Sequence, residues 1–411
     1  MSNRILLRRT AALTVIALAA CTDHSAKVLG PRPPQGNGIF QSYVSLGNSI
    51  TAGYQSAGIN DSTQAQSYAV RLAGQMGTRF AFPALAKPGC PPPINDFNRQ
   101  TRVTLAGQPA STSSTCALRS NTVAILNNVA VPGATSGDPD APATPPSPSA
   151  NLLTQLFLGG ETQVQRARDA NPTFASVWIG NNDVLGPALS GLLGGVTPQA
   201  TFQTNYDKLI TDLTKDNSAL KGVLIGVANV ADLPLLFSGR ALQNPQFVAA
   251  LSAAAGKTIT PDLTTCTATT NSLVSFLIVS AIATNQHPAQ IACEKKNDPN
   301  FPPLGDLYVL DSGELATLAS YLAAVNGYIT TKAQGIGFAY FNPNAALDSL
   351  RAIGEISSIG PNVNAPTAAF GKWISLDGVH PSGAAHQLLA NRLIEVINAK
   401  YSTTLTKLPN P

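Results

Sequence analysis

The sequence predicts an α/β protein, a three-layer α/β/α sandwich built around a mostly parallel five-stranded sheet that carries insertions. Short apolar segments rich in Val, Ile, Phe and Tyr alternate with longer segments of helical period, as in parallel βαβ units. Hydrophobic residues make up 44% of the 411 residues, enough for a large core and against a disordered chain. Charged residues make up only 12%, about half of the usual share of roughly 25%.

The alternation starts after a polar N-terminal stretch and continues to the C-terminus. The β-rich apolar segments predict strands at 39–46, 123–131, 174–179, 223–228 and 337–341. The longer segments predict helices at 67–76, 151–170, 202–213, 314–333 and 384–400. In the range 151–170 the apolar residues recur at helical spacing for most of the length.

Residues 1–20 have the pattern of an export signal. Three arginines precede a short apolar run, which is too short for a bilayer span of about 20 residues and indicates a cleaved signal peptide. The run ends in Leu-Ala-Ala-Cys, which resembles the bacterial lipobox and implies that Cys21 becomes the lipid-modified first residue. An ordinary signal peptide is the alternative. Thr22 follows instead of Asp, which implies an outer-membrane or cell-surface lipoprotein in a bacterial envelope.

The formal net charge of +4 belongs largely to this signal, which holds three arginines and no acidic residue. The rest of the chain is nearly neutral, and no segment combines clustered Lys and Arg with aromatic residues, so no nucleic-acid partner is expected. Residues 21–38 contain three prolines and three glycines and predict a flexible tether. The tether would hold a folded domain, residues 39–404, near a membrane.

Four further cysteines fit an exported protein: Cys90, Cys116, Cys266 and Cys293. An even number of cysteines in an exported chain indicates two disulfides, for which three connectivities are possible. Pairing each cysteine with its nearest neighbour closes two loops of similar size. A zinc site is the alternative, but the chain has no C-x-x-C spacing, so we expect disulfides and no metal.

Two stretches interrupt the alternation, and each holds one pair of cysteines. Residues 87–120 are rich in Pro, Ser and Thr, and residues 231–306 form the longer insertion. Within the insertion, residues 273–283 are apolar except for two serines. This segment predicts either a buried helix of a subdomain or a lid over a lipid-binding pocket.

His380 and Asp377 form the first candidate pair for chemistry. Asp377 precedes His380 by three residues in one glycine-containing turn. At this spacing the carboxylate can bind the Nδ1–H of the imidazole, which leaves Nε2 free to act as a general base. A polar turn that only starts the last helix is the alternative.

Ser49 is the candidate nucleophile. It follows the first predicted strand directly, between Gly47 and Gly53, which allow a tight strand-to-helix turn. A serine hydroxyl needs a neighbouring base to become a nucleophile.

Two more turns follow predicted strands: one contains Gly133 and the other contains Asn182. A glycine N–H and an asparagine amide can both stabilise an oxyanion. Ser49, Gly133 and Asn182 all come at the carboxyl ends of successive parallel strands, where open α/β sheets bind their ligands.

The order Ser49, Gly133, Asn182, Asp377 and His380 resembles the SGNH/GDSL hydrolase family, whose four blocks contribute Ser, Gly, Asn and a D-x-x-H pair. The resemblance runs from about Tyr43 to Ile397. It implies a flavodoxin-like sheet and ester hydrolysis without a metal or cofactor. It also implies that Ser49 is the nucleophile, His380 the base and Asp377 its orienting partner. The oxyanion donors would be the N–H groups of Ser49 and Gly133 and the side chain of Asn182.

One position departs from the family pattern, because Asn48 replaces the usual Asp of the first block. The nucleophile is retained, so the departure bears on rate and local geometry. We therefore expect a lipid-anchored serine esterase, similar to a lipase, that acts on a lipid or an acylated small molecule through an acyl-enzyme. The alternatives are a polysaccharide O-deacetylase of the same fold and a catalytically silent lipoprotein that binds lipid or glycan.

Overall fold

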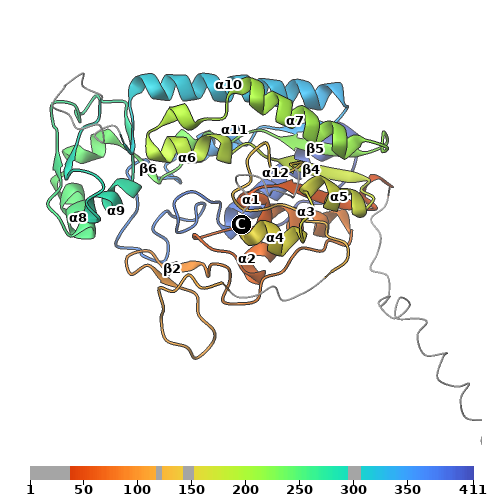
Figure 1. Cartoon of the computed structure of the whole chain (residues 1–411), viewed down its shortest axis with the longest axis horizontal. Coiled ribbons are helices and arrows are strands. Elements are labelled where there is room, and N and C mark those ends of the chain that lie inside the picture. The colour runs from red at the N-terminus through yellow and green to blue at the C-terminus, as the bar shows by residue number, and fades with distance from the viewer. Residues whose placement is uncertain (1–37, 117–122, 142–151, 295–306) are drawn as a thin grey trace, which may run out of the picture.

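The computed structural model of the chain describes residues 38–116, 123–141, 152–294 and 307–411 (Figure 1). Its centre is a four-stranded sheet in the order β1-β4-β5-β11, in which every neighbouring pair is parallel. The strands are β1 (Tyr43–Gly47), β4 (Phe174–Trp178), β5 (Lys221–Ile225) and β11 (Ala339–Phe341). The predicted parallel α/β sheet is confirmed, with one strand fewer than expected.

The predicted strand at 123–131 is wrong in detail, although this segment does lie beside β1. The backbone N–H of Ser45 donates to the carbonyl of Asn127 at 2.8 Å, and the N–H of Val129 donates to the carbonyl of Ser45 at 3.0 Å. The N–H groups of Asn127 and Asn128, however, both donate to the carbonyl of Ala81. Both asparagine side chains also bind backbone carbonyls, and such bonds compete with a regular ladder. The segment therefore forms a single bridge instead of a strand.

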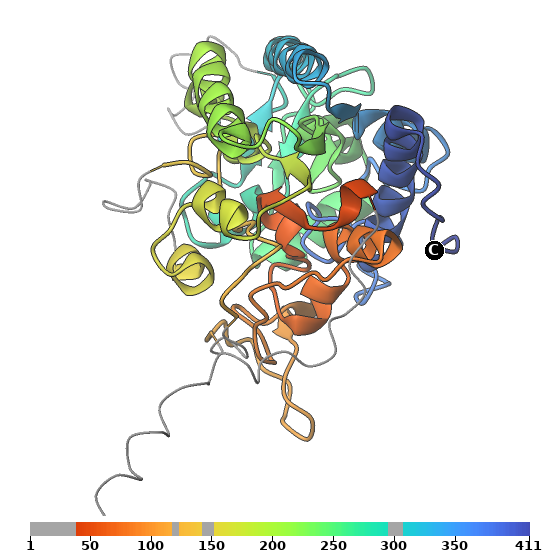
Figure 2. The same cartoon turned by 90° about the vertical axis from the view of Figure 1, so that its right-hand side faces the viewer.

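Helices cover both faces of the sheet, which completes the predicted three layers. Helices α5 (Gln163–Asp169), α7 (Gln199–Thr214) and α10 (Ser312–Gly335) pack on one face, and α3 (Tyr68–Met76) and α12 (Gly383–Tyr401) pack on the other. Figure 2 shows the sheet between these layers, with α12 in dark blue on one side and α7 and α10 in green and light blue on the other. The sheet is thus shielded from solvent on both faces, as parallel sheets require.

The side chains of the strands alternate between the two cores. In β4, Ala175 and Val177 face the core of α5, α7 and α10, whereas Phe174 and Trp178 face the core of α3 and α12. This alternation is the period of two that a strand imposes. All four side chains are buried, so hydrophobic burial holds the sheet that carries the candidate site.

The predicted helix at 151–170 is two helices, α4 (Leu152–Leu158) and α5. Gly159 and Gly160 separate them with φ angles of +64° and +94°, which favour glycine and end a helix. Thr162 then caps α5, because its side chain accepts a hydrogen bond from the N–H of Gln165. The apolar period continues through the break, so the period alone does not reveal it.

The remaining elements outside the insertion's α-helices and strands are short. They are α1 (Ser49–Ala52), α2 (Asp61–Ala65), α6 (Asn182–Ser190), α11 (Asn344–Ala352), β2 (Ile94–Asp96) and β3 (Thr101–Arg102), with 3-10 helices at Gly38–Phe40, Leu193–Gly195, Val230–Asp232 and Gly239–Gln243.

After β5, the insertion has a hydrophobic core of its own. It contains α8 (Pro245–Ala255), α9 (Leu277–Ala283), β6 (Leu236–Ser238), β7 (Thr260–Pro261), β8 (Leu273–Ser275) and β9 (Gln290–Ile291). Strand β8 pairs antiparallel with β6 and with β10 (Val309–Leu310). Figure 1 shows α8 and α9 at one end of the molecule, away from the central sheet. The apolar segment 273–283 is therefore a strand at Leu273–Ser275 followed by a helix at Leu277–Ala283, and Ile278 and Ile282 are buried in this separate core.

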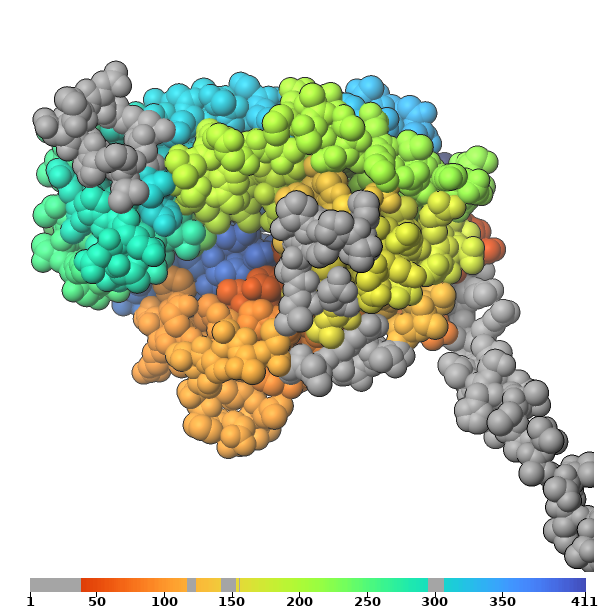
Figure 3. All heavy atoms as spheres, viewed as in Figure 1, coloured from red at the N-terminus to blue at the C-terminus, as the bar shows by residue number. Residues whose placement is uncertain are grey.

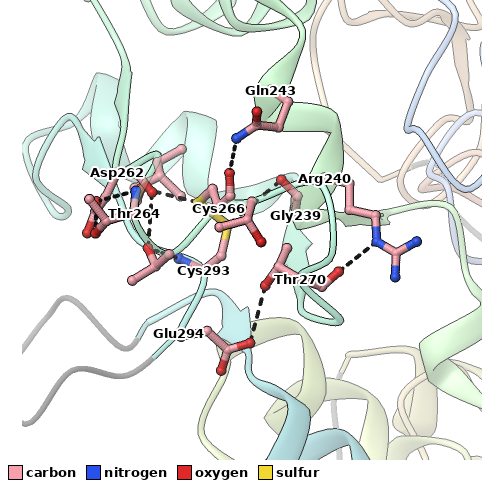
Figure 4. The surroundings of a disulfide bond; sticks show 12 residues. Gly239, Arg240, Gln243, Asp262, Thr264, Cys266, Thr270, Cys293 and Glu294 are labelled. Atoms are coloured by element: carbon pink, nitrogen blue, oxygen red, sulfur yellow. Dashed lines mark hydrogen bonds between the residues drawn. A yellow bond between two sulfur atoms is a disulfide. The ribbon is translucent and has the colours of Figure 1, made fainter.

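Two disulfides join neighbouring cysteines, Cys90 with Cys116 and Cys266 with Cys293. Figure 4 shows the second disulfide among polar contacts of the insertion. The N–H of Cys293 donates to the hydroxyl of Thr265 at 3.1 Å. These disulfides indicate an extracellular or exported protein.

In the part of the chain that the structure describes, no helix is both long and apolar enough to cross a membrane. The predicted signal peptide, residues 1–20, lies outside the described residues, as does Cys21. The predicted tether, residues 21–38, is described only at Gly38.

Candidate active site

Ser49 is the first residue of α1 and follows the sharp turn at the end of β1. Asn48 caps the helix, because its Oδ1 accepts a hydrogen bond from the N–H of Ile50 at 3.1 Å. At Gly47 a Cβ atom would lie only 2.4 Å from the hydroxyl of Thr51 and 2.6 Å from the carbonyl of Trp178. Only glycine has room there, and the turn places Ser49 at the carboxyl end of the sheet.

Ser49, His380 and Asp377 form one continuous hydrogen-bonded row. The Ser49 Oγ lies 2.8 Å from the His380 Nε2, and the His380 Nδ1 lies 2.8 Å from the Asp377 Oδ2. Ser49 is 7% exposed, and the side chains of His380 and Asp377 are 14% and 10% exposed. The three groups are thus nearly buried, but they remain within reach of a small molecule.

Asp377 is held by several donors besides His380. Its Oδ1 accepts from the N–H groups of Val379 and His380 at 2.9 and 2.8 Å, and its Oδ2 accepts from the N–H of Ala57 at 2.8 Å. Burial raises the pKa of Asp377, but the neighbouring imidazole and these hydrogen bonds outweigh burial and hold the pKa well below its usual range. Asp377 is therefore a carboxylate, and the proton between Asp377 and His380 belongs to the imidazole Nδ1.

Tyr54 packs beside this row, with its ring centroid 4.9 Å from that of His380. Burial and the nearby charge of Asp377 raise the pKa of Tyr54 to about 12. Tyr54 is therefore a neutral wall of the site at ordinary pH.

Gly133 and Asn182 lie near the same end of the sheet. The segment before Gly133 is bound to β1, since the N–H of Val131 donates to the carbonyl of Gly47 at 3.2 Å. Asn182 follows β4, which is in register with β1, and its Nδ2 donates to the carbonyl of Ala134 at 2.8 Å. The Asn182 side chain and the Gly133 turn are therefore fixed to each other.

Two donors of this region remain available. Within the described residues, the backbone N–H groups of Ser49 and Gly133 have no hydrogen-bond acceptor. Gly133 has a φ of +88°, a conformation that favours glycine. Figure 3 shows a hollow on this face of the molecule, where red and blue atoms from both ends of the described chain meet between green and orange segments.

Two supporting residues were not predicted from the sequence. Asp183 is buried, and its carboxylate accepts from the N–H and the hydroxyl of Ser136 at 2.8 and 2.6 Å. Gln163 is also buried, and its amide binds both the N–H and the carbonyl of Gly47 at 2.9 and 3.0 Å. Asp183 directly follows Asn182, which is a usable signal. Gln163 lies far from Gly47 in sequence, and no local pattern identifies it.

Asn48 caps α1 at the position where the family pattern has Asp. Its Oδ1 makes the helix-capping bond described above, which an Asp carboxylate would also make. Its Nδ2 is buried without a hydrogen-bond partner among the described residues. The substitution therefore keeps the turn but leaves one amide donor unsatisfied.

The described residues contain no cluster of three or more His, Cys, Asp or Glu side chains that could hold a metal ion. The polar groups at the carboxyl end of the sheet include a serine, an imidazole, a carboxylate and amide donors.

Comparison with known proteins assigns the chain to a family. No curated protein matches the chain. Residues 43–393, however, match the model of the family described as GDSL-like Lipase/Acylhydrolase, which supports hydrolase activity on esters in general. The match begins with β1, ends within α12 and includes all five residues of the ordered motif. The chain therefore belongs to the GDSL-like Lipase/Acylhydrolase family.

Proposed function

We propose that the protein is a serine esterase that hydrolyses carboxylic esters of lipids or acylated small molecules through an acyl-enzyme. The single observation that carries this proposal is the row Ser49 Oγ, His380 Nε2, His380 Nδ1 and Asp377 Oδ2, joined by two contacts of 2.8 Å. Such a row transfers the serine proton to a base that is already oriented. The resemblance of the ordered motif gives the same roles.

In the first half-reaction His380 Nε2 takes the hydroxyl proton while Ser49 Oγ attacks the ester carbonyl carbon. The carbonyl oxygen becomes an oxyanion, and the N–H groups of Ser49 and Gly133 and the amide of Asn182 are the proposed donors to it. Asp377 stabilises the imidazolium that forms. When the intermediate collapses, the carbon–oxygen bond to the alcohol breaks and His380 returns the proton to the leaving oxygen.

In the second half-reaction water takes the place of the alcohol. His380 removes a proton from the water, and the resulting hydroxide attacks the acyl carbon. The bond between this carbon and Ser49 Oγ breaks, and His380 returns the proton to Ser49. The products are a carboxylic acid and an alcohol, and no cofactor is consumed.

Substitution of Ser49 by Ala tests the proposal directly. We expect Ser49→Ala to reduce turnover of a chromogenic acetyl ester to the background rate, because the nucleophile is lost. Ser45→Ala is the matched control: Ser45 is buried in β1, and its hydroxyl has no hydrogen-bond partner in the described part of the chain. This control should keep wild-type turnover, since loss of an unsatisfied hydroxyl costs little.

Fluorophosphonate labelling separates the esterase from a silent binding lipoprotein. A reactive Ser49 forms a phosphonyl adduct, and mass spectrometry should place the adduct on the peptide that contains Ser49. Unchanged ester turnover in Ser49→Ala would contradict the proposed nucleophile. An unlabelled Ser49 in the folded wild-type protein would favour the binding function instead.

We also propose that Cys21 carries a lipid that anchors the enzyme to a bacterial envelope membrane. The lipobox-like sequence before Cys21 and the tether-like composition of residues 21–38 support this anchor. The two disulfides support export. Metabolic labelling with a radioactive fatty acid should mark the wild type and not Cys21→Ser. Equal labelling of the two proteins would contradict the anchor.

A further inference from the structure

An apolar pocket lies beside the proposed catalytic residues and has no role in the mechanism above. Its sixteen lining residues are all Ala, Val, Leu, Ile, Pro or Trp, and the space inside, with its mouth, is about 570 Å³. The lining therefore suits an apolar group and offers almost nothing to a polar group.

The position of the pocket links it to the reaction. Ile50, which lines it, is the residue after Ser49, and Val379 and Pro381, which also line it, stand on either side of His380. An apolar group held in this pocket therefore contacts residues that are adjacent in sequence to Ser49 and His380.

Helices α11 and α12 form the outer walls. Ala346, Leu347 and Leu350 of α11 line the pocket, whereas Ala345 and Asp348 of the same helix are exposed. None of the residues of α11 is fully buried. The apolar face of α11 therefore covers the pocket but is not fully packed against other side chains. A ligand chain would complete the burial of this face.

Both tryptophans of the chain also line the pocket. Trp178 is buried at the end of β4, and Trp373 is partly exposed. The indole N–H of Trp373 donates to the Glu355 carboxylate at 3.0 Å, which fixes this ring. Indole fluorescence therefore reports occupation of the pocket with no background from tryptophans elsewhere.

We propose that this pocket binds the unbranched apolar chain of the ester substrate and thereby makes the enzyme prefer long-chain esters to acetyl esters. This inference rests on the proposed esterase function. The specificity would then come from α11 and α12 and not from segment 273–283, whose helix packs in the separate core of the insertion. An acetyl group on a polysaccharide would leave the pocket empty, which argues against the O-deacetylase.

Each methylene group that leaves water for an apolar pocket favours binding by about fourfold. We therefore expect kcat/KM to rise at least tenfold from the acetyl to the decanoyl ester of nitrophenol. A second series compares kcat/KM for decyl acetate and ethyl acetate. Together the two series determine whether the pocket binds the acyl chain or the alcohol chain of the ester. A rise with chain length in either series supports the pocket, and the absence of a rise in both series overturns it.

A pair of neighbouring substitutions on α11 tests the location of the chain. Ala346→Trp fills the pocket and should lower the ratio of decanoyl to acetyl turnover at least tenfold. Ala345→Trp adds the same side chain on the exposed face of the same helix and should keep the wild-type ratio. If both variants fold and both keep that ratio, the chain does not bind between α11 and α12.

The wild-type protein gives an independent readout that needs no variant of the pocket. Decyl fluorophosphonate should attach to Ser49 and shift the tryptophan emission to the blue, whereas ethyl fluorophosphonate should attach without this shift. Equal emission from the two adducts would contradict the binding of the apolar chain in the pocket, but it would not contradict the proposed esterase function. Failure of both reagents to react, with no turnover of any ester, would overturn the proposed function itself.

Discussion

Two buried or nearly buried aspartates each support a different part of the site. Asp377 binds the imidazole of His380, and Asp183 binds Ser136 in the turn that carries Gly133. Asp183 is 2% exposed, and the side chain of Asp377 is 10% exposed. Both carboxyls are therefore removed from most of the solvent, yet their pKa values move in opposite directions.

The difference follows from their partners. Burial raises the pKa of Asp183, and the hydrogen bonds from uncharged Ser136 do not fully offset it. At Asp377, burial is outweighed by an imidazole that can become a cation and by several backbone N–H donors. Asp377 is thus equipped to stabilise a developing positive charge on His380, whereas Asp183 is equipped to hold a loop.

The largest expected effect comes from Asp377→Asn. The amide cannot stabilise an imidazolium or select the productive tautomer of His380, so kcat should fall about 10⁴-fold. The new Oδ1 still accepts from the N–H groups of Val379 and His380, so the fold should persist. Steady-state kinetics with an acetyl ester and thermal unfolding measure the two effects.

Asp216→Asn is the control for this variant, because the Asp216 side chain is 73% exposed and should be dispensable. A loss of less than tenfold in Asp377→Asn would show that the two aspartates do not differ in the proposed way.

A smaller effect is expected on the oxyanion side. Asn182→Ala removes one proposed donor and should lower kcat by about 10²–10³-fold. Asn181→Ala is a closely matched control, since Asn181 is adjacent and its Oδ1 has no hydrogen-bond partner within the described residues. A larger loss of kcat in Asn181→Ala than in Asn182→Ala would mean that Asn181, and not Asn182, supplies the oxyanion donor.

Much of the fold could be predicted because each layer leaves a periodic signal. β4, for example, sends alternate side chains into two cores, and its five residues are all buried. The edge segment at 123–131 has the same apolar composition, but its asparagines bind the backbone of Ala81, Tyr43 and Thr51. Those partners are distant in sequence, so composition alone predicts a strand there.

The candidate site was predictable where its residues are neighbours in sequence or follow strands. Asp377 and His380 are three residues apart, and Ser49 and Asn182 come just after parallel strands. Gln163 was not predictable, because it meets Gly47 only when α5 packs on the sheet. The apolar pocket beside His380 was missed for the same reason, since it combines residues from Ile50 to Leu389.

Asp183→Asn should have a smaller effect on turnover than Asp377→Asn or Asn182→Ala. The amide cannot accept both hydrogen bonds from Ser136 as a carboxylate does, so the Gly133 turn should loosen and kcat should fall about tenfold. Ser136→Ala keeps the backbone bond to Asp183 and should lose less. Equal or greater loss in Ser136→Ala would mean that the hydroxyl, and not the carboxylate, positions the turn.

The pH dependence of stability gives these two aspartates opposite signs. Burial raises the folded-state pKa of Asp183 above the ordinary value of about 3.9, so the folded state binds the proton more tightly than the unfolded state. The contribution of Asp183 to the free energy of unfolding therefore grows as the pH falls from the folded-state pKa to about 3.9. Asp377 has a lowered pKa, so its contribution to stability is present above about pH 3.9 and is lost as the pH falls toward the lower folded-state pKa.

Urea unfolding of wild type and Asp183→Asn at a series of pH values isolates the contribution of Asp183. The stability of the wild type relative to this variant should increase from neutral pH to about pH 4. A decrease over this range would mean that the Asp183 carboxylate is stabilised as strongly as that of Asp377, and the distinction between a charge-stabilising and a loop-holding aspartate would then be wrong.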